Sequence, residues 1–250
     1  TVYYGGTVEF HHDNGSNTTG GIVGGTNSVI SNHGTINFLY ADEAGQTLQI
    51  TCPLSNYGDI NFGSSTQAVK VALELPASSP FDEAFLQSGS SATTTLWAGS
   101  SLTATDIVVE TGLFQTAGSA GTIYLIGNLT FTGGTLLIGV TDGNLQTLDV
   151  SADCVFSGAT VKFTLNGGTA NACDKLIVGG DLSISTSTLD VKTVGSAANA
   201  TNVWQLIYAP DHTGDFSNFN FTGLTAGWDT KGWSGDYYRL TGAMLAGGEG

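Results

Sequence analysis

Residues 227–239, GWDTKGWSGDYYR, hold the densest group of side chains that could bind a ligand. Aromatic rings and carboxylates are interleaved there: Trp228, Asp229, Trp233, Asp236, Tyr237 and Tyr238. Aromatic rings stack on apolar sugar faces, and carboxylates accept hydrogen bonds from sugar hydroxyls, so the stretch predicts a glycan-binding site. Trp233, flanked by glycines, is expected in a loop with an exposed ring, while Trp228 packs under a cap. Bulky aromatics also cap the last repeat of an elongated fold, and both interpretations stay open.

Four aspartates close in sequence raise an enzymatic alternative. They are Asp211, Asp215, Asp229 and Asp236. Two carboxylates about 5 to 9 Å apart hydrolyse glycosidic bonds, although nothing in this spacing brings a pair together. The alternative function is therefore a secreted hydrolase, a protease or glycosidase with an acidic active site, acting on host glycoproteins such as mucins. Whether the chain is an enzyme stays open, and no cofactor is expected.

The stretch EFHHDNGSN, residues 9–17, is the most metal-like. On a strand, His11 and Asp13 share one face and His12 points to the other. Two ligands therefore converge at most, and a third must come from elsewhere. The competing interpretation is a polar loop.

The charge balance excludes two classes of partner. The net charge is −15 with six Lys and Arg residues, too few for a surface that binds nucleic acid or anionic membranes. Only 11% of residues are charged, against about 25% in typical proteins. No apolar run is long enough to span a bilayer, and no signal peptide is visible. The composition favours an exported protein, secreted or on the outer cell surface, and does not indicate the oligomeric state.

A short phrase of a small residue, Thr and alternating apolar residues recurs along the chain. In residues 123–138, 148–163 and 176–191 it carries Thr135, Thr160 and Thr188, which are 25 and 28 residues apart. Alternation with period two indicates half-buried strands, and a tandem unit of this length indicates a solenoid. We expect an all-β fold, a parallel β-helix. Two β-sandwich or jelly-roll domains are the alternative, because they also consist of short alternating strands.

Overlaying the three segments predicts which side chains stack. One internal column is Phe131, Phe156 and Ile184, and the next is Leu129, Cys154 and Leu182. Cys154 is therefore expected in the core, and a bridge between Cys154 and Cys173 stays open.

The chain divides into two regions. Residues 1–119 are β-rich with weak repeats, and residues 120–250 are the repeat region with a C-terminal cap. A short helix is expected near residues 80–88, within SPFDEAFLQSG (79–89), because Pro80 opens it and Asp82 and Glu83 fall in its first turn.

Residues 120–246 resemble the C-terminal portion of autotransporter-associated β-strand repeat proteins. The pattern D-x-L-x-V-x-G matches Asp174, Leu176, Val178 and Gly180, and further matches are Trp204, Leu206, Ile207, Gly214, Phe216, Trp228 and Leu240–Leu245. The resemblance implies a bacterial, exported, β-helical surface protein, and no catalytic residue is carried over. We therefore expect a structural or adhesive role, with glycans or glycoproteins as partners.

Overall fold

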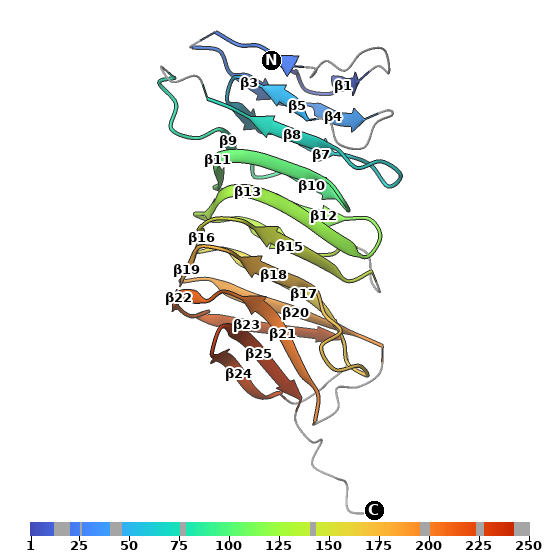
Figure 1. Cartoon of the computed structure of the whole chain (residues 1–250), viewed down its shortest axis with the longest axis vertical. Coiled ribbons are helices and arrows are strands. Elements are labelled where there is room, and N and C mark those ends of the chain that lie inside the picture. The colour runs from blue at the N-terminus through green and yellow to red at the C-terminus, as the bar shows by residue number, and fades with distance from the viewer. Residues whose placement is uncertain are drawn as a thin grey trace, which may run out of the picture.

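The structure, a computed structural model, describes residues 1–12, 21–25, 27–40, 47–75, 79–140, 144–195, 201–223 and 228–242. These residues form β-strands and no helix, so the predicted all-β class is confirmed. The strands lie across a long axis, with the N-terminal strands at one end and the C-terminal strands at the other (Figure 1). No helix of the described chain is long and apolar enough to cross a membrane.

The strands form three ladders. The first ladder is a nine-stranded sheet of β1 (Thr7–His12), β4 (Thr35–Tyr40), β7 (Asp59–Phe62), β10 (Thr93–Trp97), β12 (Leu113–Ala117), β14 (Thr135–Leu137), β17 (Thr160–Asn166), β20 (Thr188–Val194) and β23 (Asn218–Gly223). The second ladder runs in the order β2 (Gly21–Ile22), β5 (Leu48–Ile50), β8 (Lys70–Leu73), β11 (Ser101–Val109), β13 (Gly121–Phe131), β15 (Gln146–Val150), β18 (Lys175–Val178), β21 (Val203–Tyr208), β25 (Tyr237–Gly242) and β24 (Trp228–Ser234). The third ladder consists of β3 (Ile30–Asn32), β6 (Leu54–Asn56), β9 (Phe85–Gln87), the ends of β11 and β13, β16 (Cys154–Ser157), β19 (Asp181–Ser185) and β22 (Asp211–Gly214).

Each pass of the chain adds one strand to each ladder in turn. From β14 the chain runs to β15 and β16, and it returns to the first ladder at β17, which pairs with β14 in parallel. The two longest strands, β11 and β13, each continue from the second ladder into the third. Since β11 pairs with β13, the two regions divided at residue 120 share the same sheets.

The predicted register is confirmed residue by residue. Thr135 pairs with Thr160, which pairs with Thr188. Phe131 pairs with Phe156, and Phe156 with Ile184. Cys154 lies between Leu129 and Leu182 and is fully buried. The period-two alternation thus positions one face of every repeat inside, because a slip of one residue would turn each apolar side chain to the solvent.

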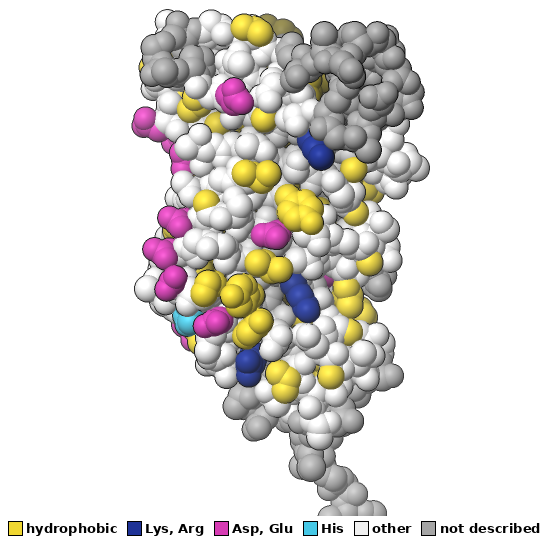
Figure 2. Space-filling model, viewed as in Figure 1, with side chains coloured by type: hydrophobic (Ala, Val, Ile, Leu, Met, Phe, Trp, Pro, Cys, Tyr) yellow, Lys and Arg dark blue, Asp and Glu magenta, His cyan; other side chains and the backbone are white. Residues whose placement is uncertain are grey.

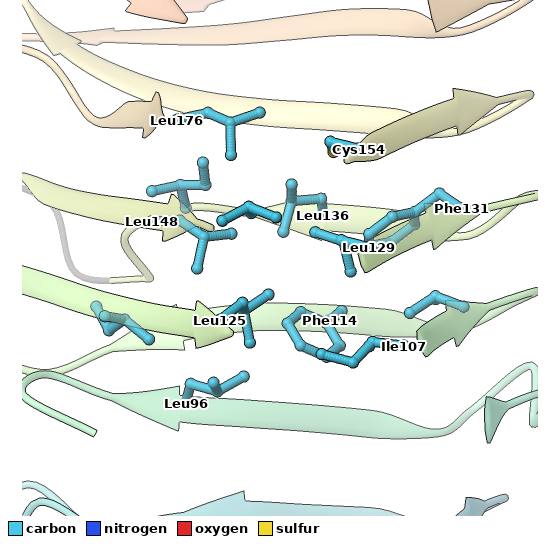
Figure 3. Close-up of a cluster of buried hydrophobic side chains, with 14 of the residues drawn as sticks. Leu96, Ile107, Phe114, Leu125, Leu129, Phe131, Leu136, Leu148, Cys154 and Leu176 are labelled. Carbon is cyan, nitrogen blue, oxygen red and sulfur yellow. The ribbon is translucent and has the colours of Figure 1, made fainter. Parts of the chain in front are cut away.

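The core is a continuous stack of apolar side chains from all three ladders. In Figure 3, Leu125, Leu148 and Leu176 of the second ladder point toward Leu136 of the first and Leu129 of the third. A phenylalanine column runs through it with ring-centroid separations of 5.1 to 6.4 Å, made of Phe10, Phe38, Phe62, Phe85, Phe114, Phe131 and Phe156. Burying one such ring contributes about 1.5 to 3 kcal/mol.

A buried column of amides closes the turns between the third and first ladders. Asn32 Nδ2 donates to Asn56 Oδ1 at 2.9 Å, and Asn56 Nδ2 donates to Gln87 Oε1 at 3.4 Å. The Asn56 Oδ1 atom also accepts from the Gly58 backbone N–H at 3.1 Å. At Gly58 an added Cβ would strike the Gly34 carbonyl oxygen, so this turn requires glycine. The amides satisfy backbone groups that the tight turns leave without a strand partner.

The helix expected near residues 80–88 is wrong, because Phe85–Gln87 forms β9. Phe85 is fully buried and pairs with Leu54 and Ile107 on either side. The Gln87 amide donates to the Thr111 carbonyl at 2.9 Å. A helix of about ten residues is marginal by itself, and the paired strand offers more buried contact to the same side chains.

The last hairpin, β24–β25, ends the parallel stack. β25 pairs antiparallel with both β21 and β24. Lys231 of β24 places its ammonium 3.8 Å from the centre of the Phe219 ring in β23. Trp233 of β24 stacks on His212 of β22. The hairpin therefore contacts β21, β22 and β23, the last strands of the parallel stack, and covers the end of the core.

The cysteines of the described chain are free thiols, all buried. The bridge between Cys154 and Cys173 is therefore not formed. Cys154 sits in the third ladder, whereas the Cys173 thiol lies 3.5 Å from the Gln205 carbonyl oxygen beside the second.

Candidate functional site

The structure describes the side chains of four of the six aromatic and acidic residues predicted to form one site, and these four do not all face the same way. Tyr237 and Tyr238 are neighbours in β25, so they point to opposite faces, with Tyr238 buried and Tyr237 at the surface. Asp236 is exposed in the turn before β25. Trp228 and Asp229 lie in β24, where the structure describes their backbone but not their side chains. The candidate metal ligands fall outside it as well, since only the backbone of His11 is described and Asp13 is not.

Trp233 lies in a strand and not in the exposed loop expected from its flanking glycines. Its ring stacks on His212 with centroids 3.7 Å apart and meets Tyr238 edge-on at 5.2 Å. The His212 Nδ1 is 3.1 Å from the Ala209 carbonyl oxygen, which orients the imidazole ring. Trp233 packs against the core because β24 has to cover the end of the third ladder. Trp233 therefore belongs to the cap.

Tyr238 also belongs to the cap. Its hydroxyl donates to Asp215 Oδ1 at 3.0 Å, and the same oxygen accepts from the Phe216 backbone N–H at 2.7 Å. Burial raises the pKa of Tyr238 far above its usual value, and the negative charge and hydrogen bond of Asp215 raise it further. The phenol stays protonated and serves as a fixed donor. Asp215 is thus engaged by the cap through its hydrogen bonds to Tyr238 and Phe216.

A hollow of about 300 Å³ opens on the outer face of the second ladder, beside the cap. It is lined by Lys175, Leu176, Ile177, Gln205, Tyr208 and Tyr237. Figure 2 shows hydrophobic and charged side chains together over the lower part of the molecule, where Figure 1 places β15, β18, β21 and β25. Of the predicted ligand-binding residues in the described chain, Tyr237 is the one that lines this hollow.

Strand register arranges the lining residues in two rows across β18, β21 and β25. Ile177 pairs with Tyr208, and Tyr208 with Tyr237, so these three form an apolar row. The Tyr208 and Tyr237 rings have centroids 5.0 Å apart and planes inclined by 51°. Gln205 pairs with Arg239, and Lys175 lines the same hollow, so these three form a polar row alongside the apolar one, although the described pairing of β18 with β21 does not join Lys175 to Gln205. On β18 and β25 the outward residues are two apart, Lys175 and Ile177 on the first and Tyr237 and Arg239 on the second, so each pair shares a face of the sheet. On β21, Gln205 and Tyr208 are three apart and share that face because the register shifts between Gln205 and Ile207.

Charged groups around the hollow are unevenly distributed. Lys175 lines the hollow, and the Arg239 guanidinium lies 5.4 Å from the centre of the Tyr237 ring. Asp149, the residue paired with Ile177 on β15, is the neighbouring carboxylate on this face. Burial raises the pKa of Asp149 above its usual value. Positive charge therefore adjoins the aromatic rings, and the nearest carboxylate on β15 is partly desolvated.

Asp174, just before Lys175, is fully buried behind the hollow. Its two carboxylate oxygens accept from the Gln146 backbone N–H at 2.8 Å and the Thr164 backbone N–H at 2.7 Å. One side chain thereby ties β15 of the second ladder to β17 of the first. This explains why an acid starts the D-x-L-x-V-x-G phrase, and it fixes the start of β18, from which Lys175 projects.

Two further hollows on the outer face of the first ladder offer less to a ligand. They share Leu137 and Lys162, and their volumes are about 620 and 250 Å³. The Lys162 ammonium is already paired with Asp190 Oδ2 at 3.2 Å. No Tyr or Trp lines either one, and Phe163, which lines the smaller hollow, is buried in the core, so neither offers an exposed aromatic platform to a sugar ring.

Acidic side chains gather along the edge where third-ladder strands begin. Asp153 Oδ1 accepts from the Asp181 backbone N–H at 2.9 Å, and Asp181 pairs with Asp211. Asp106 Oδ1 accepts from Asn128 Nδ2 at 3.0 Å. The carboxylates of Asp106 and Asp153 thus bond to neighbouring strands, and no group of three His, Cys, Asp or Glu side chains able to hold a metal occurs among the described residues.

The sequence pointed to Tyr237 but missed Lys175, Gln205, Tyr208 and Arg239. Lys175 and Tyr237 come from strands more than 60 residues apart, and no local phrase links them. Extending the repeat alignment by one more unit would have placed Tyr208 beside Ile177, because Leu176 and Ile177 pair with Ile207 and Tyr208.

No protein-family model matches this chain, and no curated protein matches it.

Proposed function

We propose that this chain is a parallel β-helix from a secreted or surface-displayed bacterial protein that adheres to glycans or glycoproteins. The helical path is supported by parallel ladders whose strands recur in sequence order, with residues stacked at the spacing of the repeats. Two sandwich domains would instead contain mainly antiparallel neighbours. The likeness of residues 120–246 to autotransporter-associated β-strand repeats supports the exported, adhesive role.

The observation that carries the binding function is the pair of rows in the hollow between β18 and β25. Tyr208 and Tyr237 provide inclined ring faces, and Gln205 beside them provides an amide donor and acceptor. Sugars have apolar faces and hydroxyl-rich edges, so an aromatic row next to a polar row matches one ring at a time. The volume of about 300 Å³ lies at the small end for ligand sites and suits one or two sugar units.

A glycan array that includes mucin-type glycoproteins tests the proposal, with Tyr237→Ala as the diagnostic variant. Loss of one aromatic platform should weaken binding by about 1 to 3 kcal/mol, because Tyr237 forms one wall of the hollow. Tyr4→Ala is the matched control, since Tyr4 is 92% exposed near the N-terminus, far from the hollow. Equal binding by both variants, or absence of binding to any glycan, would overturn the proposal. Turnover of a glycoprotein in the same screen would favour the hydrolase instead.

A further inference from the structure

The positions of the few cations in this acidic chain carry information about the ligand. The net charge is −15, with six Lys and Arg residues in all. Two of them, Lys175 and Arg239, adjoin the hollow between β18 and β25. A site that binds only neutral ligands does not need two cations beside it, and cations are scarce in this chain, which has 21 Asp and Glu residues and six Lys and Arg residues.

Neither cation is neutralised by a carboxylate in the described structure. Elsewhere Lys162 pairs with Asp190, and Lys231 lies over the Phe219 ring. Lys175 has no ion pair with a described acid. Arg239 stacks on Tyr237, and its Nε atom is shielded from water without an acceptor among the described residues. The guanidinium is thus held by an aromatic face and not by an acid.

The acidic residues around the hollow do not neutralise Lys175 or Arg239. Asp149 is the carboxylate on β15 beside Ile177, and it forms no ion pair with a described cation. Asp174 is buried behind β18 and accepts from two backbone N–H groups. Asp236 is exposed in the turn before Tyr237, where its own backbone carbonyl accepts from the Ala209 N–H. Neither positive charge is therefore paired with a carboxylate of the described chain.

The spacing of the cations fits a single charged sugar. Lys175 projects from β18 and Arg239 from β25, with β21 between them. Neighbouring strands are about 4.8 Å apart, so the two backbones are separated by about 10 Å, with Gln205 in the gap. A sugar ring lying against Tyr208 and Tyr237 would have its edge directed toward this polar row.

We propose that the hollow selects glycans that carry a carboxylate, such as sialic or uronic acids, with Lys175 and Arg239 recognising the charge. This inference rests on the proposed glycan-binding function and specifies its ligand class. The planar guanidinium matches the two oxygens of a carboxylate, and the ammonium adds a point charge. Sulfated sugars present a different anion, and the test below separates them.

The test compares 3′-sialyllactose with its methyl ester, with lactose and with 3′-sulfated lactose, by calorimetry on the wild-type chain. The methyl ester keeps the sugar and removes only the charge. We expect the acid to bind about tenfold more tightly than its ester, a difference of about 1.4 kcal/mol, because the ester cannot form charge-assisted hydrogen bonds with Lys175 and Arg239. Lys175→Gln and Arg239→Gln should each reduce the ratio of acid to ester affinity toward one. Lys162→Gln, a cation outside the hollow, should keep the ratio.

The outcomes separate this inference from the proposed function. Equal binding of acid and ester, still sensitive to Tyr237→Ala, overturns the charge selection and leaves glycan binding intact. Tighter binding of the sulfated sugar than of the carboxylate overturns the carboxylate assignment. If no glycan binds at all, the proposed function fails together with the inference. Melting temperatures of the variants show whether a change in the ratio of acid to ester affinity comes from the binding site or from loss of the fold.

Discussion

Cys154 occupies an internal position that its repeat neighbours fill with leucine. It is fully buried between Leu129 and Leu182, and burial raises the pKa of its thiol far above the usual value. In this setting a cysteine acts as a small apolar side chain, and its thiolate is inaccessible.

We expect Cys154→Ser to lower the free energy of unfolding by about 1 to 3 kcal/mol, because a hydroxyl of similar size would be buried without a guaranteed partner. Chemical denaturation measures this change, and Cys154→Ala is the matched control that removes the sulfur without adding a polar group. Thiol labelling of the native protein should be slow at Cys154 and fast after unfolding. Fast labelling in the folded state would contradict the core position.

A second residue-scale prediction concerns alkaline pH. Burial raises the pKa of Cys173 from 9.0 to about 12, and the nearby Lys175 charge opposes this only in part. The folded thiol keeps its proton where the unfolded one loses it, so its contribution to stability is complete below about pH 9 and declines as pH rises toward 12. The slope is about 1.4 kcal/mol per pH unit for one such group.

Chemical denaturation from pH 8 to 11 checks whether the free energy of unfolding falls as pH rises. Wild-type stability should fall more steeply than that of Cys173→Ala, which has no thiol to ionise at this position. The comparison cancels the general repulsion of an acidic chain, because both proteins carry the other titrating groups. Parallel pH profiles would show that burial of Cys173 is not linked to proton binding.

At the scale of elements, the β24–β25 hairpin changes the role of the aromatic cluster. The sequence placed Trp233 in a loop, whereas the strand brings it onto His212 and Tyr238. The interpretation of the cluster as a cap accounts for Trp233 and Tyr238, and the interpretation as a ligand site accounts for Tyr237.

Trp233→Ala should therefore destabilise the fold by about 2 to 3 kcal/mol, somewhat less than the loss for a fully buried tryptophan, and leave the hollow beside Tyr237 in place. Thermal and chemical unfolding measure the loss. A double-mutant cycle with His212→Ala isolates the stacking, and a coupling near zero would mean that the 3.7 Å contact between the rings contributes nothing. Unchanged stability with lost glycan binding would restore the exposed-loop interpretation.

At the scale of the whole molecule, the ladders make stability a sum over neighbouring repeats. Thr160 and Thr188 occupy equivalent places, since each follows its predecessor in the first ladder with the same register. Removing residues 160–187 would join Ala159 to Thr188 and return every later side chain to an equivalent position.

We expect this 28-residue deletion to leave a folded, shorter β protein that unfolds cooperatively, because the remaining repeats can stack on one another. Circular dichroism and hydrodynamic size check the result. The control deletes residues 160–186, which puts Ser187 in the place of Thr160 and turns each following apolar side chain outward. If both deletions unfold the chain equally, the repeats are not interchangeable and the β-helix inference fails.

The sequence by itself determined the repeat, its register and the side chains of its core. Alternation showed which residues face inward, because a strand offers only two faces and one must be apolar. Overlaying the repeats then predicted that Phe131 stacks on Phe156 and that Thr135 lies beside Thr160. The β9 segment could not be predicted in this way, since its local signals favour a helix and only pairing with β6 and β11 decides for a strand. The hollow beside Tyr237 was likewise decided by tertiary structure. Lys175, Tyr208 and Tyr237 belong to three separate strands, and hydrogen bonding between those strands brings them together where no local pattern can record it.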